Sequence, residues 1–105
     1  MSAKPYRLQC EATPGQFADE LAISGKNHKG VEFSFFCHRQ FVETEQEPQG
    51  EEAVPAYIRV TELDRDGELV LIRLPGQTLA NGQTITVRRQ ELEDAPAGQN
   101  AKAGT

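Results

Sequence analysis

Apolar and polar residues alternate in two segments of the first half of the chain. Tyr6, Leu8 and Cys10 alternate with charged or amide side chains, and the alternation returns between Val31 and Val42. A period of two is typical of a strand that buries one face. We therefore predict a strand over 6–10 and another over 31–42. The second strand is expected to bury one set of side chains: Val31, Phe33, Phe35 and Cys37.

Residues 14–23, which lie between these strands, fit either a strand or a short helix. Thr13 could cap a helix that has Pro14 at its first position. The apolar residues of 17–24 mostly share one parity, however, and a glycine-bounded loop follows at 25–30. Because a loop between two strands makes a hairpin, we prefer the strand.

The second half carries clearer signals. We predict strands over 57–63, 68–74 and 84–87, and one helical turn over 88–92. Asp66 and Gly67 supply the positive φ that a short hairpin turn needs, and Asn81-Gly82 is a second turn signal. Residues 69–72 are apolar on both parities, which predicts a central strand covered on both faces.

A stretch of ten residues occurs twice, fifty positions apart. Residues 34–43 align without a gap on 84–93, and each copy is a strand-like run, then Arg-Gln, an apolar residue and a glutamate. Residues 20–23 lie at the same offset from 70–73. The repeat suggests two strand-turn-strand units packed with pseudo-twofold symmetry. It indicates an architecture and no particular reaction.

Five or six short strands separated by turn signals predict an all-β fold. The best fit is a small antiparallel barrel, SH3-like or OB-like, formed by a single domain over 1–94. The low-complexity tail, 95–105, is expected to be disordered. Residues 43–53 hold five glutamates and no lysine or arginine, which predicts a mobile acidic loop between the halves. These five residues account for the net charge of −5.

The sequence contains no sign of export or membrane insertion. No apolar run approaches the roughly 20 residues needed to cross a bilayer, and the N-terminus lacks the apolar stretch of a signal peptide. We therefore expect a cytoplasmic protein that does not contact a membrane. Cys10 and Cys37 are then expected to be reduced and buried.

The residues that could carry chemistry lack the spacing that chemistry requires. Cys10, Cys37, His28 and His38 contain no pair at the short spacing of a zinc site. Cys37 lies among phenylalanines, and burial disfavours the thiolate that a catalytic cysteine needs. We predict no metal, no cofactor and no enzymatic activity.

Binding is the remaining class of function. Small barrels often bind single-stranded nucleic acid through an exposed aromatic ring with a rim of cations. The candidates for such a site are Lys26, Lys29, Phe36, Arg39, Arg88 and Arg89. If the halves repeat, Arg39 and Arg89 are equivalent. The leading hypothesis is nevertheless a binding or adaptor module for another protein, with nucleic-acid binding as the alternative. Nothing in the sequence fixes the oligomeric state.

Overall fold

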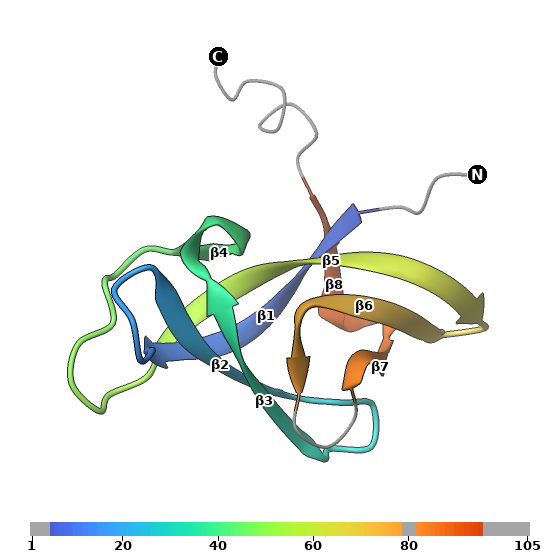
Figure 1. The fold of residues 1–105 in the computed structure, drawn as a ribbon. Coiled ribbons are helices and arrows are strands. Elements are labelled where there is room, and N and C mark those ends of the chain that lie inside the picture. Colours follow the sequence, from blue (N-terminus) through green and yellow to red (C-terminus); the bar gives the residue numbers. More distant parts are fainter. Residues whose placement is uncertain (1–4, 79–81, 96–105) are drawn as a thin grey trace.

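The computed structural model describes residues 5–78 and 82–95, which form eight antiparallel strands and two short 3-10 helices (Figure 1). The elements are β1 (Pro5–Pro14), β2 (Glu20–Lys26), β3 (Glu32–His38), η1 (Arg39–Phe41), β4 (Val42–Thr44), β5 (Val54–Asp66), β6 (Leu69–Thr78), β7 (Gly82–Arg88), η2 (Arg89–Glu91) and β8 (Leu92–Asp94). Six strands run in the order β3-β2-β1-β5-β6-β7, while β4 pairs with β5 and β8 pairs with β1. The sheet curls into a half-barrel (Figure 1), so the predicted all-β class is confirmed.

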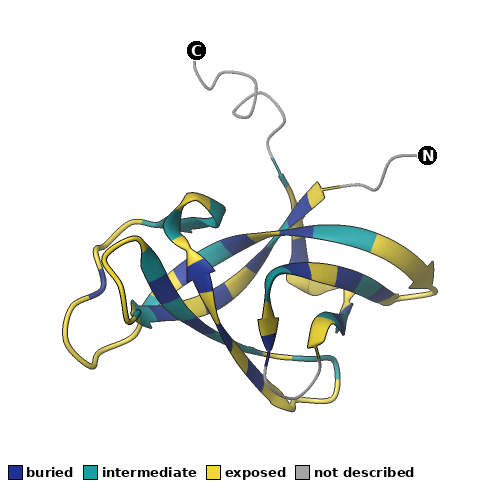
Figure 2. Cartoon of the chain, viewed as in Figure 1, coloured by how far each residue is buried: buried dark blue, intermediate teal, exposed yellow. Residues whose placement is uncertain are grey.

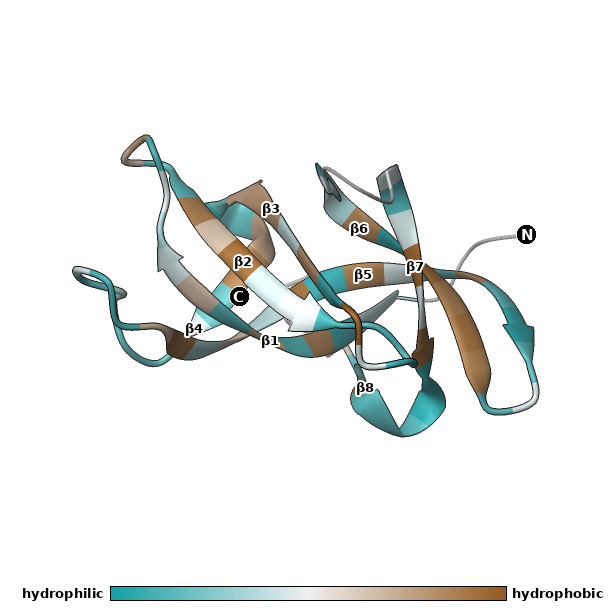
Figure 3. Cartoon of the chain, turned by 90° about the horizontal axis from the view of Figure 1, so that it is seen from below, coloured by the Kyte–Doolittle hydropathy of each residue, from teal (hydrophilic) through white to brown (hydrophobic). Residues whose placement is uncertain are grey.

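Alternation along the strands places one set of side chains in a common core. Buried and exposed bands follow one another along the strands in Figure 2, and the apolar bands of Figure 3 follow the same rhythm. The predicted inward sets of β1 and β3 are confirmed except at Val31, which precedes β3 and is exposed. The core is made of Tyr6, Leu8, Cys10, Ala12, Leu21, Ile23, Phe33, Phe35, Cys37, Ala56, Ile58, Val60, Val70, Ile72, Leu74, Ile85, Val87 and Leu92.

The two halves of the chain repeat one another in structure. Strand β3, helix η1 and strand β4 begin and end fifty residues before β7, η2 and β8, respectively. The single helical turn predicted after the second copy is confirmed as η2, and the first copy has its counterpart in η1. The repeated stretch therefore encodes the same local structure twice.

Strand pairing shows that these halves are related by a pseudo-twofold axis. Leu8 is paired with Ile58, the residue fifty positions later, at the middle of the β1–β5 ladder. An axis between these two residues exchanges the halves, because the pairs from Pro5↔Thr61 to Glu11↔Pro55 then map onto one another. The short strands obey the same symmetry, since Val42 pairs with Ile58 and Leu92 pairs with Leu8. Each half thus donates its last short strand to the first strand of the other half.

Strands β2 and β6 correspond with an offset of 49 residues, not 50. Leu21 pairs with Cys37, while Val70 pairs with Val87, which is the repeat counterpart of Cys37. The predicted match of 20–23 with 70–73 is therefore wrong by one residue. A β-bulge between Glu62 and Asp64 inserts one residue into β5, but the two-residue turn that follows is two residues shorter than the matching part of the β1–β2 turn, which leaves a net deletion of one residue.

The segment before β2 is neither the predicted strand nor a helix. Strand β2 begins at Glu20, and residues 15–19 form bends and a turn. The Gly15 N–H donates to Glu20 O at 3.2 Å, and the Glu20 N–H donates to Phe17 O at 3.1 Å. These bonds close a tight loop that turns Phe17 outward, so its parity with Leu21 had no structural meaning.

Strand β6 is covered on one face, contrary to the prediction from its apolar run. Val70 and Ile72 are buried, whereas Leu69 is 36% exposed and Leu71 is half-buried on the outer face. The hairpin before it forms, but its turn lies later than predicted: β5 continues to Asp66, and the two-residue turn begins at Gly67, whose φ of +63° favours glycine. Asn81 lies outside the described residues.

The acidic residues 43–53 have more contacts than a solvated loop requires. Glu43 and Thr44 belong to β4, Pro48 is buried, and Gln49 forms a β-bridge with Glu52. The mobility of this segment stays a prediction. The predicted disorder of the tail falls on residues that are, from 96 onward, outside the described part of the chain.

The two ends of the sheet approach the opposite half and so curl the barrel. At one end, the His28 N–H of the β2–β3 loop donates to Thr86 O of β7 at 2.9 Å. At the other end β6 lies against β3, where a Cβ built on Gly76 would come within 2.8 Å of Phe36 O and 2.7 Å of a Phe35 ring carbon.

Replacing Gly76 with alanine should therefore reduce the free energy of unfolding by about 1–3 kcal/mol, the usual range for an overpacked site. The methyl group would push against backbone, which cannot rotate away as a side-chain tip can. Urea unfolding measures the effect, with Gln77→Ala, a change at the exposed neighbour in the same strand, as the control. Equal stability of the two variants would show that β3 and β6 are free to separate.

Candidate functional site

The six residues predicted to bind lie on β2, the β2–β3 loop, β3, η1, β7 and η2. Arg88 donates from Nη2 to His28 O at 3.3 Å, which brings the loop carrying Lys29 next to the end of β7. Lys26 lines an open cleft of about 630 Å³ beside β1, which Gln90 and Glu91 of η2 also line. The other residues lining this cleft are Leu8, Gln9, Cys10, Glu11, Ser24, Gly25, Glu32, Gln90, Glu91 and Glu93. Four carboxylates thus surround Lys26, which makes this cleft a poor place for a phosphate.

Arg39 and Arg89 occupy equivalent positions at the starts of η1 and η2, as predicted from the repeat. Arg39 donates from Nε to Ala18 O at 2.7 Å and from both terminal nitrogens to Glu47, at 3.1 and 2.6 Å. Arg89 donates to Leu92 O at 3.1 Å and lies over the Tyr6 ring, 5.0 Å from its centroid. Both guanidinium groups are bound within the fold.

The Arg39–Glu47 pair joins the start of η1 to the acidic segment 43–53. Its hydrogen bond lowers the pKa of Glu47 below the ordinary value of 4.5 and raises the pKa of Arg39. Because the Nε of Arg39 binds Ala18 O, the pair ties the acidic segment 43–53 to the turn that carries Phe17.

Replacing Arg39 with glutamine should raise the pKa of Glu47 toward its ordinary value, because the charged hydrogen bonds to the carboxylate are lost. The intact pair should persist above pH 4.5 and break as the pH falls through the lowered pKa of folded Glu47. Carbon-detected NMR of the Glu47 carboxyl group measures the titration. An unchanged titration in the variant would mean that the pair does not form in solution.

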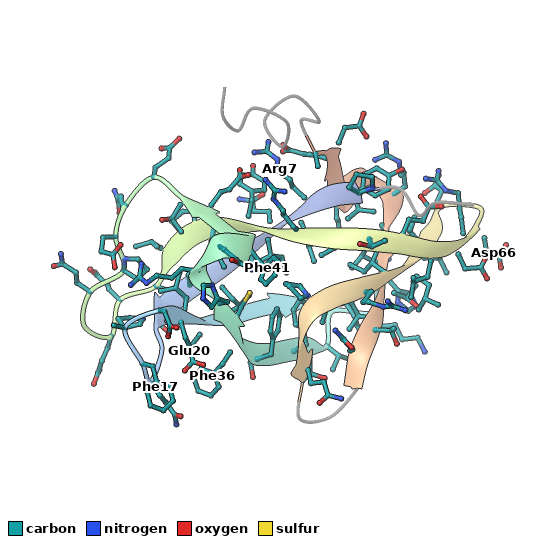
Figure 4. All side chains as sticks on the ribbon, turned by 45° about the horizontal axis from the view of Figure 1, so that its top comes forward. Arg7, Phe17, Glu20, Phe36, Phe41 and Asp66 are labelled. Carbon is teal, nitrogen blue, oxygen red and sulfur yellow. The ribbon has the colours of Figure 1, made fainter. Side chains whose placement is uncertain are left out.

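Phe36 lies on the outer face of the β2–β3 hairpin, as its parity predicted. It is 48% exposed and pairs across the hairpin with Ala22, while Phe35 and Cys37 point into the core. Phe17, in the turn before β2, is 67% exposed and lies close to Glu20, with Phe36 on the neighbouring strand (Figure 4). We call Phe17, Ala22 and Phe36 the aromatic patch. The sequence pattern found Phe36 but grouped Phe17 with the apolar residues on one face of the predicted strand.

A polar cluster that the sequence analysis missed lies on the pseudo-twofold axis. Arg7 donates to Glu43 at 2.8 Å and to Glu93 at 2.7 Å, and these glutamates are the last residues of the two repeat copies. Tyr57, the counterpart of Arg7, donates to Glu93 at 3.1 Å and lies 4.6 Å beneath the Arg7 guanidinium. Glu43 raises the pKa of Arg7, and Glu93 raises the pKa of Tyr57. The cluster holds β4 and β8 on the central ladder. Its signal in the sequence was the glutamate that ends each copy.

The cysteines do not form a nucleophilic site with the histidines. Burial raises the pKa of Cys10 to about 12 and that of Cys37 to about 11. The Cys37 thiol lies 3.5 Å from the backbone oxygen of His38, and His38 Nδ1 accepts the Gln40 N–H at 3.1 Å. The imidazole is therefore engaged with backbone and does not face the thiol as a base would.

The described residues, 5–78 and 82–95, contain neither a cluster of metal ligands nor a membrane-spanning helix. No three His, Cys, Asp or Glu side chains there come together as a metal site would require. Among the same residues, no helix has the length and apolar character to cross a bilayer.

Comparison with known proteins finds no relative of this chain. The chain matches no protein-family model, and neither the curated proteins nor the solved structures contain a match.

Proposed function

We propose that this protein is a non-catalytic binding module that docks another protein on its aromatic patch. The observation that carries the proposal is the exposure of two phenylalanine rings, Phe36 on the outer face of the β2–β3 hairpin and Phe17 in the turn that leads into it. Phenylalanine is enriched in protein interfaces, and aromatic side chains dominate interfaces energetically because they bury much area with little loss of entropy. An exposed aromatic pair that contributes nothing to the core is therefore best explained by a partner.

The other half of the molecule supports this assignment by contrast. Thr86 is the counterpart of Phe36 on β7, fifty residues later in the repeat. Its neighbour across the ladder, Leu71, is the counterpart of Ala22 and remains half-buried. The same architecture can thus present a polar residue at this position, so the fold itself does not demand a phenylalanine there.

Nucleic-acid binding, the alternative, has the exposed Phe36 ring in its favour, because bases stack on such rings. Its cations are less suitable. Arg39 is bound to Glu47 and Arg89 to Leu92 O, while Lys26 lies among carboxylates. Phosphate binding at Arg39 or Arg89 would have to compete with these internal bonds. The cytoplasmic location and the absence of catalysis stay predictions from the sequence.

Site-specific photo-crosslinking tests the proposal. A benzophenone amino acid placed at position 36 of the full chain should give a discrete adduct with another protein in cells. The matched control carries the same group at position 86, the repeat counterpart, and should give none. The adduct should also disappear when Phe17 is replaced with serine in the same chain. Equal labelling from both positions, or labelling that ignores Phe17, would contradict docking on the aromatic patch.

NMR spectra of the labelled protein test the alternative. Mixed short single strands of RNA and DNA should leave the amide shifts unchanged at low salt. Salt-reversible shifts around Lys26, Lys29, Arg88 and Arg89 would instead favour nucleic acid, because cations that neutralise phosphates release counterions.

A further inference from the structure

We infer that the partner of the aromatic patch is a positively charged protein segment, in which apolar side chains alternate with lysine or arginine. This inference rests on the proposed docking function and adds the chemistry of the partner. It is carried by the carboxylates that the fold places around Phe17 and Phe36.

The first carboxylates belong to the turn and strand that carry the patch. Asp19 follows Phe17 by two residues, and its side chain is 71% exposed. Its neighbour Glu20 begins the outer row of β2 that continues with Ala22, and it lies close to Phe17 and Phe36 in Figure 4. His38, which lies across from Glu20, is 3.7 Å from an Asp19 oxygen. Two acidic side chains therefore border the rings directly.

The acidic segment 43–53 supplies the remaining carboxylates. The bidentate bond of Arg39 to Glu47, together with its bond to Ala18 O, holds this segment against the turn between Phe17 and Asp19. The segment and the β1–β2 turn lie at the same end of the molecule in two views (Figures 1 and 3). Glu51 and Glu52 are exposed there, whereas Glu45 lines a pocket with Arg7 and Tyr57. Arg39 thus acts as a positioning residue for the acidic rim.

The balance of charge at this end of the molecule is one-sided. Residues 15–22 and 46–53 contain five carboxylates and no lysine or arginine, while Arg39, which reaches both segments, is bound to Glu47. The rest of the chain is close to neutral, since the net charge is −5. A concentrated negative field attracts cationic segments and repels acidic ones, so charge complementarity at the rim would select the partner.

The outer face of the β6–β7 hairpin has neither an aromatic ring nor a carboxylate at the matching positions. There Leu69 and Arg88 take the places of Glu20 and His38. Aromatic exposure and acidic surroundings therefore occur together in one half and are absent from the matching positions of the other. This coincidence is what links the two features to one ligand.

Titration of the full-length labelled protein with three synthetic peptides tests the inference. The peptides share one length and one set of leucine and phenylalanine residues, and carry lysine, serine or glutamate at the remaining positions. The lysine peptide should shift the amides of residues 16–22 and 34–40. Its dissociation constant should rise about tenfold between about 50 and 300 mM salt, because the exposed charges are screened. The serine peptide should bind more weakly, and the glutamate peptide should not bind.

Two variants separate the inference from the proposed function. Glu51→Gln and Glu52→Gln together should weaken the lysine peptide about tenfold while leaving the serine peptide unchanged, since the aromatic patch and the Arg39–Glu47 pair stay intact. Phe17→Ser with Phe36→Ser should abolish binding of both peptides. Equal affinities of the lysine and serine peptides would overturn the charge inference alone. Failure of every peptide to shift the patch, or patch shifts caused by protein concentration alone, would overturn both proposals.

Discussion

Replacing Ile58 with alanine should reduce the free energy of unfolding by about 2–5 kcal/mol, the range for large-to-small changes in a packed core. Ile58 is fully buried, and it pairs with Leu8 of β1 and with Val42 of β4. It lies at the pseudo-twofold axis, where both halves pack against one another. Surrounding side chains belong to several strands and cannot all move to fill the space, so the loss should fall in the upper part of this range. Urea unfolding followed by circular dichroism measures it.

The control for this prediction is Leu71→Ala, which removes a branched aliphatic side chain from the outer face of β6. Leu71 is half-buried and lies outside the core, so the loss should be only about 1 kcal/mol, in proportion to the smaller apolar area removed from water. A loss at Leu71 equal to that at Ile58 would show that the outer face of β6 is covered, in contradiction to the structure.

The thiols of Cys10 and Cys37 should react with a disulfide reagent far more slowly in the folded protein than in urea. At pH 8 a thiol of pKa about 12 is ionised about a thousandth as often as one at the ordinary 9.0. The same comparison gives about a hundredfold for Cys37, whose pKa is about 11. Burial slows both further by excluding the reagent. Absorbance of the released thiolate, measured with and without urea, gives the ratio.

Cys10→Ser and Cys37→Ser are the controls, because each leaves one thiol to be followed. A single thiol that reacts as fast in the folded state as in urea would contradict its burial. Such a thiol would also be a candidate catalytic nucleophile, although His38 is not placed to act as its base.

Local patterns predicted the parts of the fold that local forces determine. The alternation in β1 and β3 identified the buried faces because a strand places every second side chain on one side of the sheet. The repeated stretch identified the pseudo-twofold symmetry, since the same ten positions form strand, helical turn and strand twice. Gly67 marked its hairpin because the turn requires a positive φ.

The errors concern features that an alternating pattern of apolar and polar residues does not encode. Nothing within 17–24 shows that backbone bonds between Gly15, Phe17 and Glu20 close a loop and turn the phenylalanine outward. The correspondence of β2 and β6 shifted by one residue because the β5–β6 turn is shorter than the turn before β2 by more than the bulge after Glu62 adds, and neither difference leaves a clear mark in an alternating pattern. The apolar run 69–72 predicted two covered faces, but cover depends on what packs there.

The candidate site was predicted in part for the same reason. The parity of β3 was enough to place Phe36 outside. Whether a cation is available to a ligand depends on its partners, and those of Arg39 and Arg89 come from other segments of the chain. Arg7 escaped notice because its partners, Glu43 and Glu93, are 36 and 86 residues away.

The paired short strands have a consequence for how the chain is opened. Thr44 pairs with Ala56 across the acidic segment, and Asp94 pairs with Tyr6 in the symmetry-related place. The ends of the described fold therefore lie where the other half has a closed hairpin loop. Joining residue 95 to residue 5 through a linker and cutting within 45–53 would give a circular permutant in which every strand keeps its neighbours. The two halves could therefore follow one another in either order along the chain. The chain could begin at residue 5 or within 45–53 without changing which strands pair.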